Sequence, residues 1–270
     1  MPHRKKIRIL IAVKTYPTFS VAHEEIVCTA GFTEDGKWIR LYPVQFRELD
    51  YASQYKKYDW IEVDVVRNES DFRPETYAPV GNIRTLSHLD TGDNWCERKK
   101  IVLRDVYTNL DKLIAQSKKP HCKSLAVFKP TVVHDFTWMP ATENWDHRKL
   151  KVLDQLKIFE RRDHKLAPVR KLPFKFLFRF EDDAGNECKR MIKDWEIGAL
   201  YWDCLERRNN NKELACADVR AKYMDDFAKK KDMFFFLGTA LQHHFKPHPF
   251  IIIGTFHPKK ETQTTLFDAR

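Results

Sequence analysis

The chain has 270 residues, of which 43% are hydrophobic, so it can bury the core of one large domain or two small ones. Its 48 Lys and Arg outnumber its 38 Asp and Glu, and the formal net charge of +10 favours a polyanionic partner. No apolar run approaches the roughly 18 residues of a membrane span, so we expect no membrane partner. The six cysteines lack CxxC spacing and no secretory leader precedes them, which indicates free thiols in a reducing, cytoplasmic setting.

The first third of the chain predicts a small β-rich unit. Residues 7–13 form a first buried strand, and residues 25–32 and 38–44 form a hairpin around an Asp-Gly turn. Residues 59–66 add a strand in which apolar and polar side chains alternate. Four strands within about sixty residues predict a small sheet or pseudo-barrel.

One strand of this unit carries alternating aromatic and basic residues. Trp38, Arg40 and Tyr42 share one face of the segment Trp-Ile-Arg-Leu-Tyr-Pro. The segment and its compact neighbouring strands resemble the small pseudo-barrels of the PUA and ASCH type, which bind RNA or modified bases. The resemblance implies a barrel fold and a nucleic-acid ligand.

The middle of the chain predicts one helix and two more strands. Apolar residues recur at helical spacing over residues 98–118, which indicates a single amphipathic helix, and strands follow at 124–128 and 131–138. We therefore expect residues 1–143 to form a β-rich N-terminal domain with one amphipathic helix. Residues 144–172 are expected to be a charged connector.

The second half predicts an α+β domain over residues 173–258. A hairpin of two strands is followed by two helices and two closing strands, an order of ββααββ. The first helix begins after Asp194, which occupies an N-cap position. The expected elements are strands at 173–180 and 187–192, helices from 194 to about 208 and at 212–230, and strands at 233–239 and 250–256.

Two pairs of carboxylates are the candidates for catalysis. Asp194 and Glu196 lie at a strand-to-helix junction, where they could hold Mg²⁺ in a nuclease, although Asp194 can equally cap the helix. Asp71 and Glu75 lie in a loop after a strand, and Arg73 between them could instead pair with both on the surface. Only the nuclease interpretation requires a cofactor, Mg²⁺; otherwise we expect none.

Basic residues next to aromatic residues and histidines predict contacts with nucleic acid. The loop at 242–248 and His257 gather four histidines, for which a metal site completed by Cys216 or a carboxylate is an alternative. This spacing matches no zinc signature, so no metal ligand is assigned. The predicted nucleic-acid contacts are Trp38, Arg40, Tyr42, Lys175, Arg179, His243, His244 and Lys246.

The last residues, 259–270, form an expected exposed tail with Gln263, Leu266 and Phe267. Their spacing resembles the peptide with which many bacterial DNA enzymes bind the replicative sliding clamp. The resemblance implies that the Gln263 amide makes anchoring hydrogen bonds, while Leu266 and Phe267 fill an apolar pocket of the clamp. Alternatively, Leu266 and Phe267 pack back onto their own domain.

These patterns predict a bacterial nucleic-acid-binding protein that acts on DNA and is recruited by its tail to replication, repair, transposition or phage-defence sites. The competing hypothesis is a metal-dependent nuclease or base-processing enzyme that uses the Asp, Glu and His residues named above. A third hypothesis is a nucleotide-binding or RNA-binding module.

Overall fold

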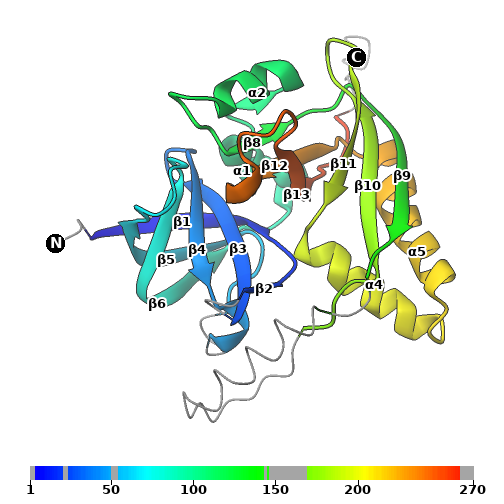
Figure 1. Ribbon diagram of the computed structural model, residues 1–270, viewed down its shortest axis with the longest axis horizontal. Coiled ribbons are helices and arrows are strands. Elements are labelled where there is room, and N and C mark those ends of the chain that lie inside the picture. The colour runs from blue at the N-terminus through cyan, green and yellow to red at the C-terminus, as the bar shows by residue number, and fades with distance from the viewer. Residues whose placement is uncertain (1–3, 21–23, 50–53, 143–144, 146–168, 262–270) are drawn as a thin grey trace, which may run out of the picture.

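A computed structural model describes residues 4–20, 24–49, 54–142, 145 and 169–261, and it contains two β-sheets (Figure 1). Most of the expected connector at 144–172 lies outside the described residues, and so do Gln263, Leu266 and Phe267. The fold is α+β, as the sequence predicts. All six cysteines are free thiols. No described helix is both long enough and apolar enough to cross a membrane.

The N-terminal sheet closes into a five-stranded barrel. Its strands pair in the order β1-β5-β6-β4-β3, and pairing of β1 with β3 closes the barrel. Only β4 and β6 are parallel. This is the strand order of the OB-fold, a five-stranded Greek-key barrel, and it confirms the predicted pseudo-barrel. The barrel strands are β1 Lys5–Lys14, β3 Glu24–Thr33, β4 Trp38–Val44, β5 Asp59–Arg67 and β6 Thr76–His88.

Two features of the barrel explain what the sequence does and does not predict. The hairpin of β3 and β4 is confirmed, and Gly36 in its turn has a φ of 78°, a conformation that favours glycine. β6 is not predicted, because Pro79 and Gly81 interrupt its alternation. Gly81 has a φ of 75° close to register shifts in the pairing of β5 with β6. The remaining short elements here are β2 Thr18–Ser20 and the 3-10 helix η1 Phe46–Glu48.

The single helix predicted at 98–118 is wrong. The structure has α1 (Gly92–Val102), a two-residue strand β7 (Val106–Tyr107) and α2 (Leu110–Ser117). β7 pairs with β8 (Leu125–Phe128), so its backbone hydrogen bonds go to a sheet. The side chain of Asn109 accepts a hydrogen bond from the backbone of Lys112 and so caps a new helix, an interaction that favours helix starts over helix interiors.

The second sheet has seven strands in the order β7-β8-β12-β13-β11-β10-β9. Strands β7, β8 and β9, within residues 106–140, therefore belong to this sheet, whereas the sequence groups them with the N-terminal unit. The hydrophobic periodicity of a strand does not show which sheet it joins. The other strands are β9 Val132–Pro140, β10 Phe174–Glu181, β11 Glu187–Ile192, β12 Phe234–Thr239 and β13 Phe250–Phe256.

The helices of the second half cover one face of this sheet (Figure 1). The predicted order ββααββ is present, with α4 (Trp195–Arg207) and α5 (Lys212–Arg220) between β11 and β12. After α5 the chain continues as a π-helix, η3 (Ala221–Ala228). Asp194 caps α4 and Asn211 caps α5, because each side chain accepts a hydrogen bond from the backbone of the first turn.

Strand β12 is buried on both faces and joins the two halves of the molecule. Phe235 packs into the core between the sheet and the helices, whereas Phe236 packs into the core between the sheet and the barrel. On the barrel side, Leu10 and Phe32 belong to the same buried cluster as Phe236. A strand buried on both faces has a continuous apolar sequence, which explains the run Phe-Phe-Phe-Leu.

Candidate nucleic-acid interface

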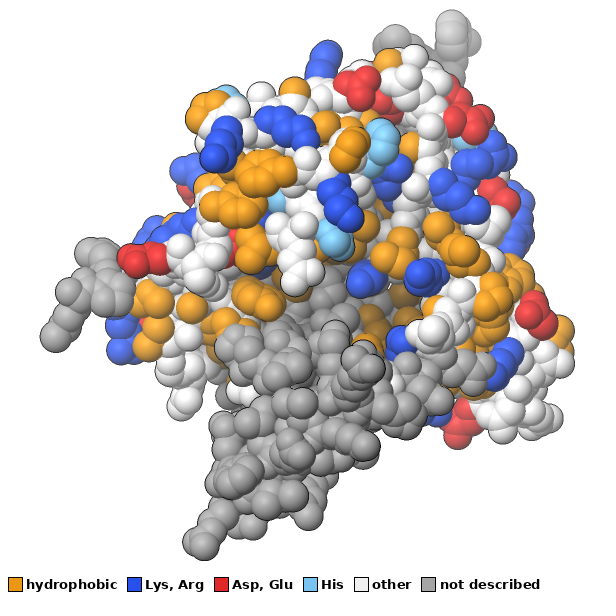
Figure 2. Space-filling view, viewed as in Figure 1, with side chains coloured by type: hydrophobic (Ala, Val, Ile, Leu, Met, Phe, Trp, Pro, Cys, Tyr) orange, Lys and Arg blue, Asp and Glu red, His pale blue; other side chains and the backbone are white. Residues whose placement is uncertain are grey.

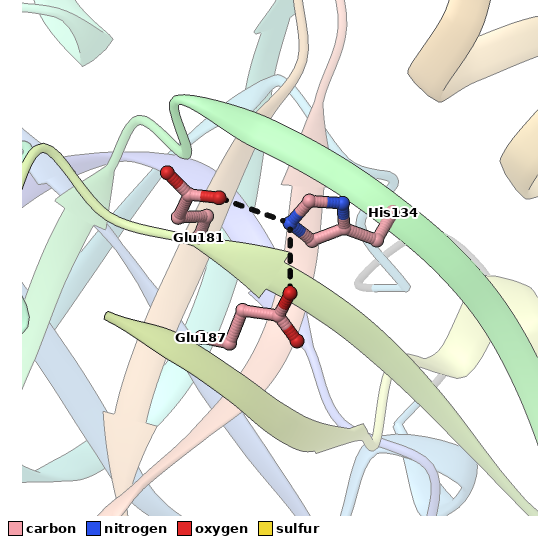
Figure 3. A group of neighbouring side chains, drawn as sticks. All are labelled: His134, Glu181 and Glu187. Carbon is pink, nitrogen blue, oxygen red and sulfur yellow. Dashed lines mark hydrogen bonds and ion pairs between the residues drawn. The ribbon is translucent and has the colours of Figure 1, made fainter. Parts of the chain in front are cut away.

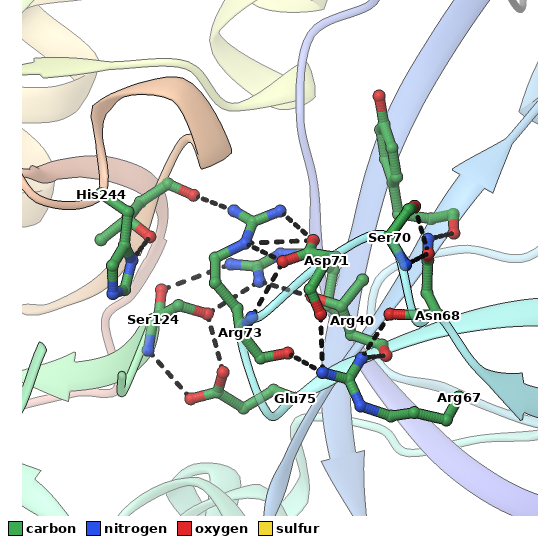
Figure 4. Close-up of polar contacts among 12 residues, drawn as sticks. Arg40, Arg67, Asn68, Ser70, Asp71, Arg73, Glu75, Ser124 and His244 are labelled. Carbon is green, nitrogen blue, oxygen red and sulfur yellow. Dashed lines mark hydrogen bonds and ion pairs between the residues drawn. The ribbon is translucent and has the colours of Figure 1, made fainter. Parts of the chain in front are cut away.

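The loop between β5 and β6 is fixed by a buried arginine (Figure 4). Arg73 donates hydrogen bonds from Nε and Nη2 to the carboxylate of Asp71 at 2.9 and 2.5 Å, and from Nη1 to the carbonyl oxygen of Thr239 at 2.5 Å. Burial by itself raises the pKa of Asp71, but its hydrogen bonds and attraction to Arg73 outweigh that effect and lower the pKa. Arg73 thus ties a barrel loop to the end of β12.

Glu75 makes a second connection between the barrel loop and the second sheet. Its two carboxylate oxygens accept hydrogen bonds from the backbone nitrogen and the hydroxyl of Ser124 at 2.9 and 2.8 Å. Asp71 and Glu75 are therefore both engaged inside the protein. The predicted surface pairing of Arg73 with both carboxylates is wrong in two respects. Arg73 and Asp71 form a buried pair, and Glu75 bonds to Ser124.

Arg40 lies in the same buried network and is 2% exposed. Its guanidinium donates hydrogen bonds to the hydroxyls of Ser124 and Thr76 at 2.7 and 3.1 Å. The prediction that Arg40 contacts nucleic acid does not fit this position, because a phosphate cannot reach a guanidinium enclosed between two sheets. The sequence pattern could not distinguish an exposed barrel face from one that a second sheet covers.

The aromatic neighbours of Arg40 are also partly enclosed. The ring centroid of Trp38 lies 4.0 Å from that of Phe32 and 5.5 Å from that of Phe236, so Trp38 packs at the seam between the sheets. Tyr42 is half-buried at the other end of β4. The interleaving of aromatic and basic residues in β4 therefore belongs mainly to internal packing.

The histidine loop between β12 and β13 contributes one buried histidine and two exposed ones, His243 and His248. His244 is fully buried, with Nδ1 2.7 Å from the Thr239 hydroxyl and Nε2 2.8 Å from the carbonyl oxygen of Ser117. Since a carbonyl only accepts, Nε2 carries the proton. Burial lowers the pKa of His244, so a neutral ring holds this loop. His244 is thus unavailable to a ligand, whereas His243 and Lys246 are exposed.

Two exposed phenylalanines from distant loops stack on each other beside this network. Phe72 and Phe245 are 44% and 48% exposed, and their ring centroids lie 4.9 Å apart with an interplanar angle of 14°. We call this pair the aromatic platform. Figure 2 shows hydrophobic side chains gathered beside Lys and Arg side chains in the region of the two loops. Both rings keep their places because the backbones beneath them are fixed by Arg73 and His244.

Cations flank the aromatic platform. The ammonium group of Lys118, at the end of α2, donates to the carbonyl oxygen of Lys246 at 3.2 Å and so lies next to Phe245. Within the described part of the chain, no carboxylate pairs with Lys118 or Lys246. Exposed rings combined with unneutralised lysines are the two components that bind single-stranded nucleic acid.

The sequence contains a signal for the platform that the predictions missed. Each phenylalanine stands in a short loop segment of the same form, Asp-Phe-Arg-Pro at 71–74 and His-Phe-Lys-Pro at 244–247. In both segments the residue before Phe is buried and hydrogen-bonded, while the Phe is exposed. A large aromatic residue in a polar, proline-containing loop is the feature that could have identified it.

The other predicted residues lie elsewhere on the second sheet. Lys175 and Arg179 are exposed on β10, opposite the buried Phe176 and Phe178, as the alternation predicts. Arg179 donates a hydrogen bond to Glu187 at 2.9 Å. They are not part of the platform.

A histidine and two glutamates meet on the same sheet (Figure 3). His134 Nε2 lies 3.2 Å from Glu181 Oε2 and 3.6 Å from Glu187 Oε1. Such donors suit a divalent cation. However, Arg179 already pairs with Glu187, and ion pairing between neighbouring strands accounts for the group. The sequence analysis missed this group because its members come from three different strands.

The four candidate carboxylates form two separate groups. Asp71 and Glu75 belong to the network described above, whereas Asp194 and Glu196 lie at the start of α4. The Asp194 carboxylate accepts from the backbone nitrogen of Glu196 at 3.3 Å, which confirms the predicted cap. Among the described residues, the group of His and acidic side chains close enough to share a metal ion includes none of these four.

Comparison with protein families divides the chain at the boundary between the two sheets. A family described as a domain of unknown function, DUF8757, matches residues 106–270. The chain belongs to the DUF8757 family. A second domain of unknown function, DUF8758, matches residues 5–104, which include the whole barrel. No curated protein matches the chain. In this member of the DUF8757 family, the platform combines one phenylalanine from each of the two matched regions.

Proposed function

We propose that the protein binds single-stranded nucleic acid, DNA in particular, across the aromatic platform. The observation that carries this proposal is the stacked, exposed pair Phe72 and Phe245 on loops that buried polar groups hold in place. Nucleic-acid bases stack on such rings irrespective of sequence. Lys118 and Lys246 stand beside the rings, where the phosphates of a bound strand would pass.

The position of the platform on the barrel supports the same function. Phe72 lies in the loop between the fourth and fifth barrel strands, β5 and β6, and this loop is one of those with which OB-folds bind oligonucleotides. A shared fold does not by itself establish a function, so the proposal depends on the exposed rings and the cations. The formal net charge of +10 favours association with any polyanion.

The proposal is tested by fluorescence anisotropy with short labelled single-stranded DNA, single-stranded RNA and duplex DNA. We expect Phe72→Ala and Phe245→Ala each to weaken binding of the single strand about tenfold or more, because each removes a stacking surface. Met139→Ala and Val132→Ala remove exposed apolar side chains from β9 and serve as controls. Equal effects of the platform and control substitutions would contradict the proposal.

The salt dependence of binding gives a second, independent measurement. Affinity should fall steeply between about 50 and 200 mM salt, because bound lysines release counterions from the phosphates. Lys246→Gln should reduce the slope of log affinity against log salt by about 0.7, the value for one phosphate contact on a single strand. Lys189→Gln, an equal change of charge on β11, should leave the slope unchanged.

Recruitment to replication, repair, transposition or phage-defence sites, within a bacterial cytoplasm, is the further part of this proposal. It depends on Gln263, Leu266 and Phe267, which lie beyond the described residues. A peptide of residues 261–270 is expected to bind a bacterial sliding clamp, and the same peptide with Leu266→Ala and Phe267→Ala is expected not to. Failure of the unaltered peptide to bind removes the recruitment hypothesis and leaves the platform unaffected.

A further inference from the structure

A cavity of about 440 Å³ lies at the seam between the barrel and the second sheet, and its residues differ from those of the platform. This volume lies within the range of small-molecule sites. Residues from both halves of the chain line the cavity, so it exists only in the assembled fold. The lining groups that matter for a ligand are Tyr58, Trp95, Glu196, Lys222, Tyr223, Phe227 and His257.

Flat rings form much of the cavity wall. Trp95 and Tyr58, from the barrel side, have ring centroids 5.9 Å apart. His257 stacks on Phe227 at 3.7 Å with an interplanar angle of 19°, and it lies 5.2 Å from Trp95. Burial, together with nearby lysines, lowers the pKa of His257 to about 3. Its imidazole is therefore neutral near pH 7 and adds a further planar surface without charge.

One carboxylate is available to the cavity. Glu196 accepts a hydrogen bond from the buried Lys57 at 3.0 Å, and its side chain is 49% exposed. Burial alone would lower the pKa of Lys57, but the charge of Glu196 outweighs this effect and raises the pKa, so Lys57 remains charged. A carboxylate only accepts hydrogen bonds. Glu196 therefore selects a ligand that carries N–H or O–H groups.

The buried hydroxyl of Tyr58 has no hydrogen-bond partner among the described residues. A buried polar group without a partner destabilises the folded state, so such groups in proteins call for an explanation. A polar ligand that enters the cavity and brings ordered water with it can supply the missing partner. This observation is independent of the ring geometry.

The backbone around the cavity is unusual in two places. Tyr58 and Trp95 both have left-handed conformations, with φ of 68° and 65°. Opposite them, Tyr223 and Phe227 project from the π-helix η3. Strained residues and π-helical turns concentrate at functional sites in proteins. Here both features position rings of the same cavity.

The edge of the cavity is positively charged. Lys222, which lines it, lies 2.8 Å from Asp226, and Lys231 lies 3.7 Å from that same carboxylate. Two lysines therefore share one acidic group, so a net positive charge remains where an anionic group of a ligand can be bound.

We infer that this cavity binds a nucleotide, with the base against the ring of Trp95 and beside the more deeply buried rings of Tyr58 and Phe227. The base donates an N–H group to Glu196, and the phosphate lies near Lys222 and Lys231. A purely apolar ligand offers no donor to the acceptor positions that Glu196 keeps beside its bond to Lys57, and a sugar lacks the planar surface that the rings would contact. The nucleotide can be a free mononucleotide or one nucleotide turned out of a bound strand, and the shared chemistry is a base linked to a phosphate.

Two binding measurements distinguish these sources. The first titrates the protein with AMP, GMP, CMP and UMP by isothermal calorimetry, and the second titrates it with a single strand containing one 2-aminopurine, whose fluorescence reports its stacking. Only the second measurement depends on the proposed function. Phe72→Ala should weaken binding of the strand and leave mononucleotide binding unchanged, so failure of one proposal is separable from failure of the other.

The variants Trp95→Leu and Glu196→Gln test the site itself. Trp95→Leu is expected to weaken nucleotide binding about tenfold or more, because a stacking wall is lost. Glu196→Gln should weaken it several-fold, whereas Glu187→Gln, the same change on β11, should not. Thermal melting checks that each variant is folded. If Trp95→Leu does not fold, Glu196→Gln still tests the site, because it leaves every ring of the cavity unchanged. The inference is overturned if the protein binds none of the mononucleotides and if the 2-aminopurine strand shows no fluorescence change that depends on Trp95.

Discussion

Arg73 donates a hydrogen bond to the carbonyl oxygen of Thr239, a residue 166 positions away in the chain. The contact joins the loop between β5 and β6 of the barrel to the last residue of β12. The contact fixes the two loops that carry the aromatic platform. Phe72 precedes Arg73 directly, and Thr239 also contacts His244, which stands next to Phe245. The proposed binding surface thus depends on the docking of the two matched regions.

Removal of this arginine should destabilise the protein strongly. Arg73→Met leaves the buried carboxylate of Asp71 without its counter-charge, and we expect a loss of about 3–5 kcal/mol in the free energy of unfolding. Urea denaturation measures the loss. Arg179→Met breaks an exposed pair with Glu187 and should cost no more than about 1 kcal/mol. Equal losses in the two variants would show that the buried pair contributes no more to stability than the exposed pair.

The packing of β12 against the barrel gives a second prediction. Phe236 is fully buried, and its ring contacts those of Phe32 and Trp38 across the seam. Phe236→Ala should lower the free energy of unfolding by about 3–5 kcal/mol, through lost burial and the cavity that remains. Limited proteolysis after about residue 104 should accelerate as well. Unchanged stability would mean that the two sheets are held together by other contacts.

The effect of Gly198→Ala in α4 on stability should change sign when one neighbouring side chain is removed. A Cβ at this position would lie 2.1 Å from the ring of Tyr16, whose hydroxyl accepts a hydrogen bond from Trp202 Nε1 at 2.8 Å. Gly198→Ala should therefore destabilise the protein by about 1–3 kcal/mol through overpacking. In a Tyr16→Ala background the same substitution should stabilise it by up to about 1 kcal/mol, because alanine favours the helix. Thermal melts of the four proteins test this reversal.

The pH dependence of stability should depend on two groups, His257 and Asp194, that have opposite effects. The pKa of His257 is lowered to about 3 by burial and nearby lysines, so the unfolded chain binds a proton more readily. Its contribution to stability is complete above about pH 6.5 and is lost as the pH falls toward 3. His257→Gln should reduce the slope of the free energy of unfolding against pH below about pH 6.5, by up to about 1.4 kcal/mol per pH unit where the slope is steepest. The exposed His121→Gln serves as the control.

Asp194 acts in the other direction. Burial raises its pKa to about 7, so the folded state holds a proton that the unfolded chain releases. Its contribution to stability is therefore lost as the pH rises from about 4 to 7. Asp194→Asn should remove this decline between about pH 4 and 7, and it should leave in place the loss of stability at low pH that His257 causes. Urea denaturation at several pH values separates the effect of Asp194 from that of His257. The assignment would be contradicted if the free energy of unfolding of Asp194→Asn changed with pH in parallel with that of the original protein.

The sequence determined the elements whose signals are local. The hairpin of β3 and β4 follows from an Asp-Gly turn, the start of α4 from the cap Asp194, and the strand character of β10 from alternating phenylalanines. Local signals failed where the outcome depends on distant partners. The single helix predicted at 98–118 is divided, because β7 pairs with a strand of the second sheet.

The tertiary structure decided which residues reach the surface. Arg40 satisfies every sequence criterion for a phosphate contact, yet the second sheet covers it. Phe72 resembles a core residue, yet it is exposed beside Phe245 from the other half of the chain. Periodicity shows which face of a strand is apolar, but it does not show what lies against that face. The platform and the seam cavity arise where two units dock, and their contacts join residues far apart in the sequence.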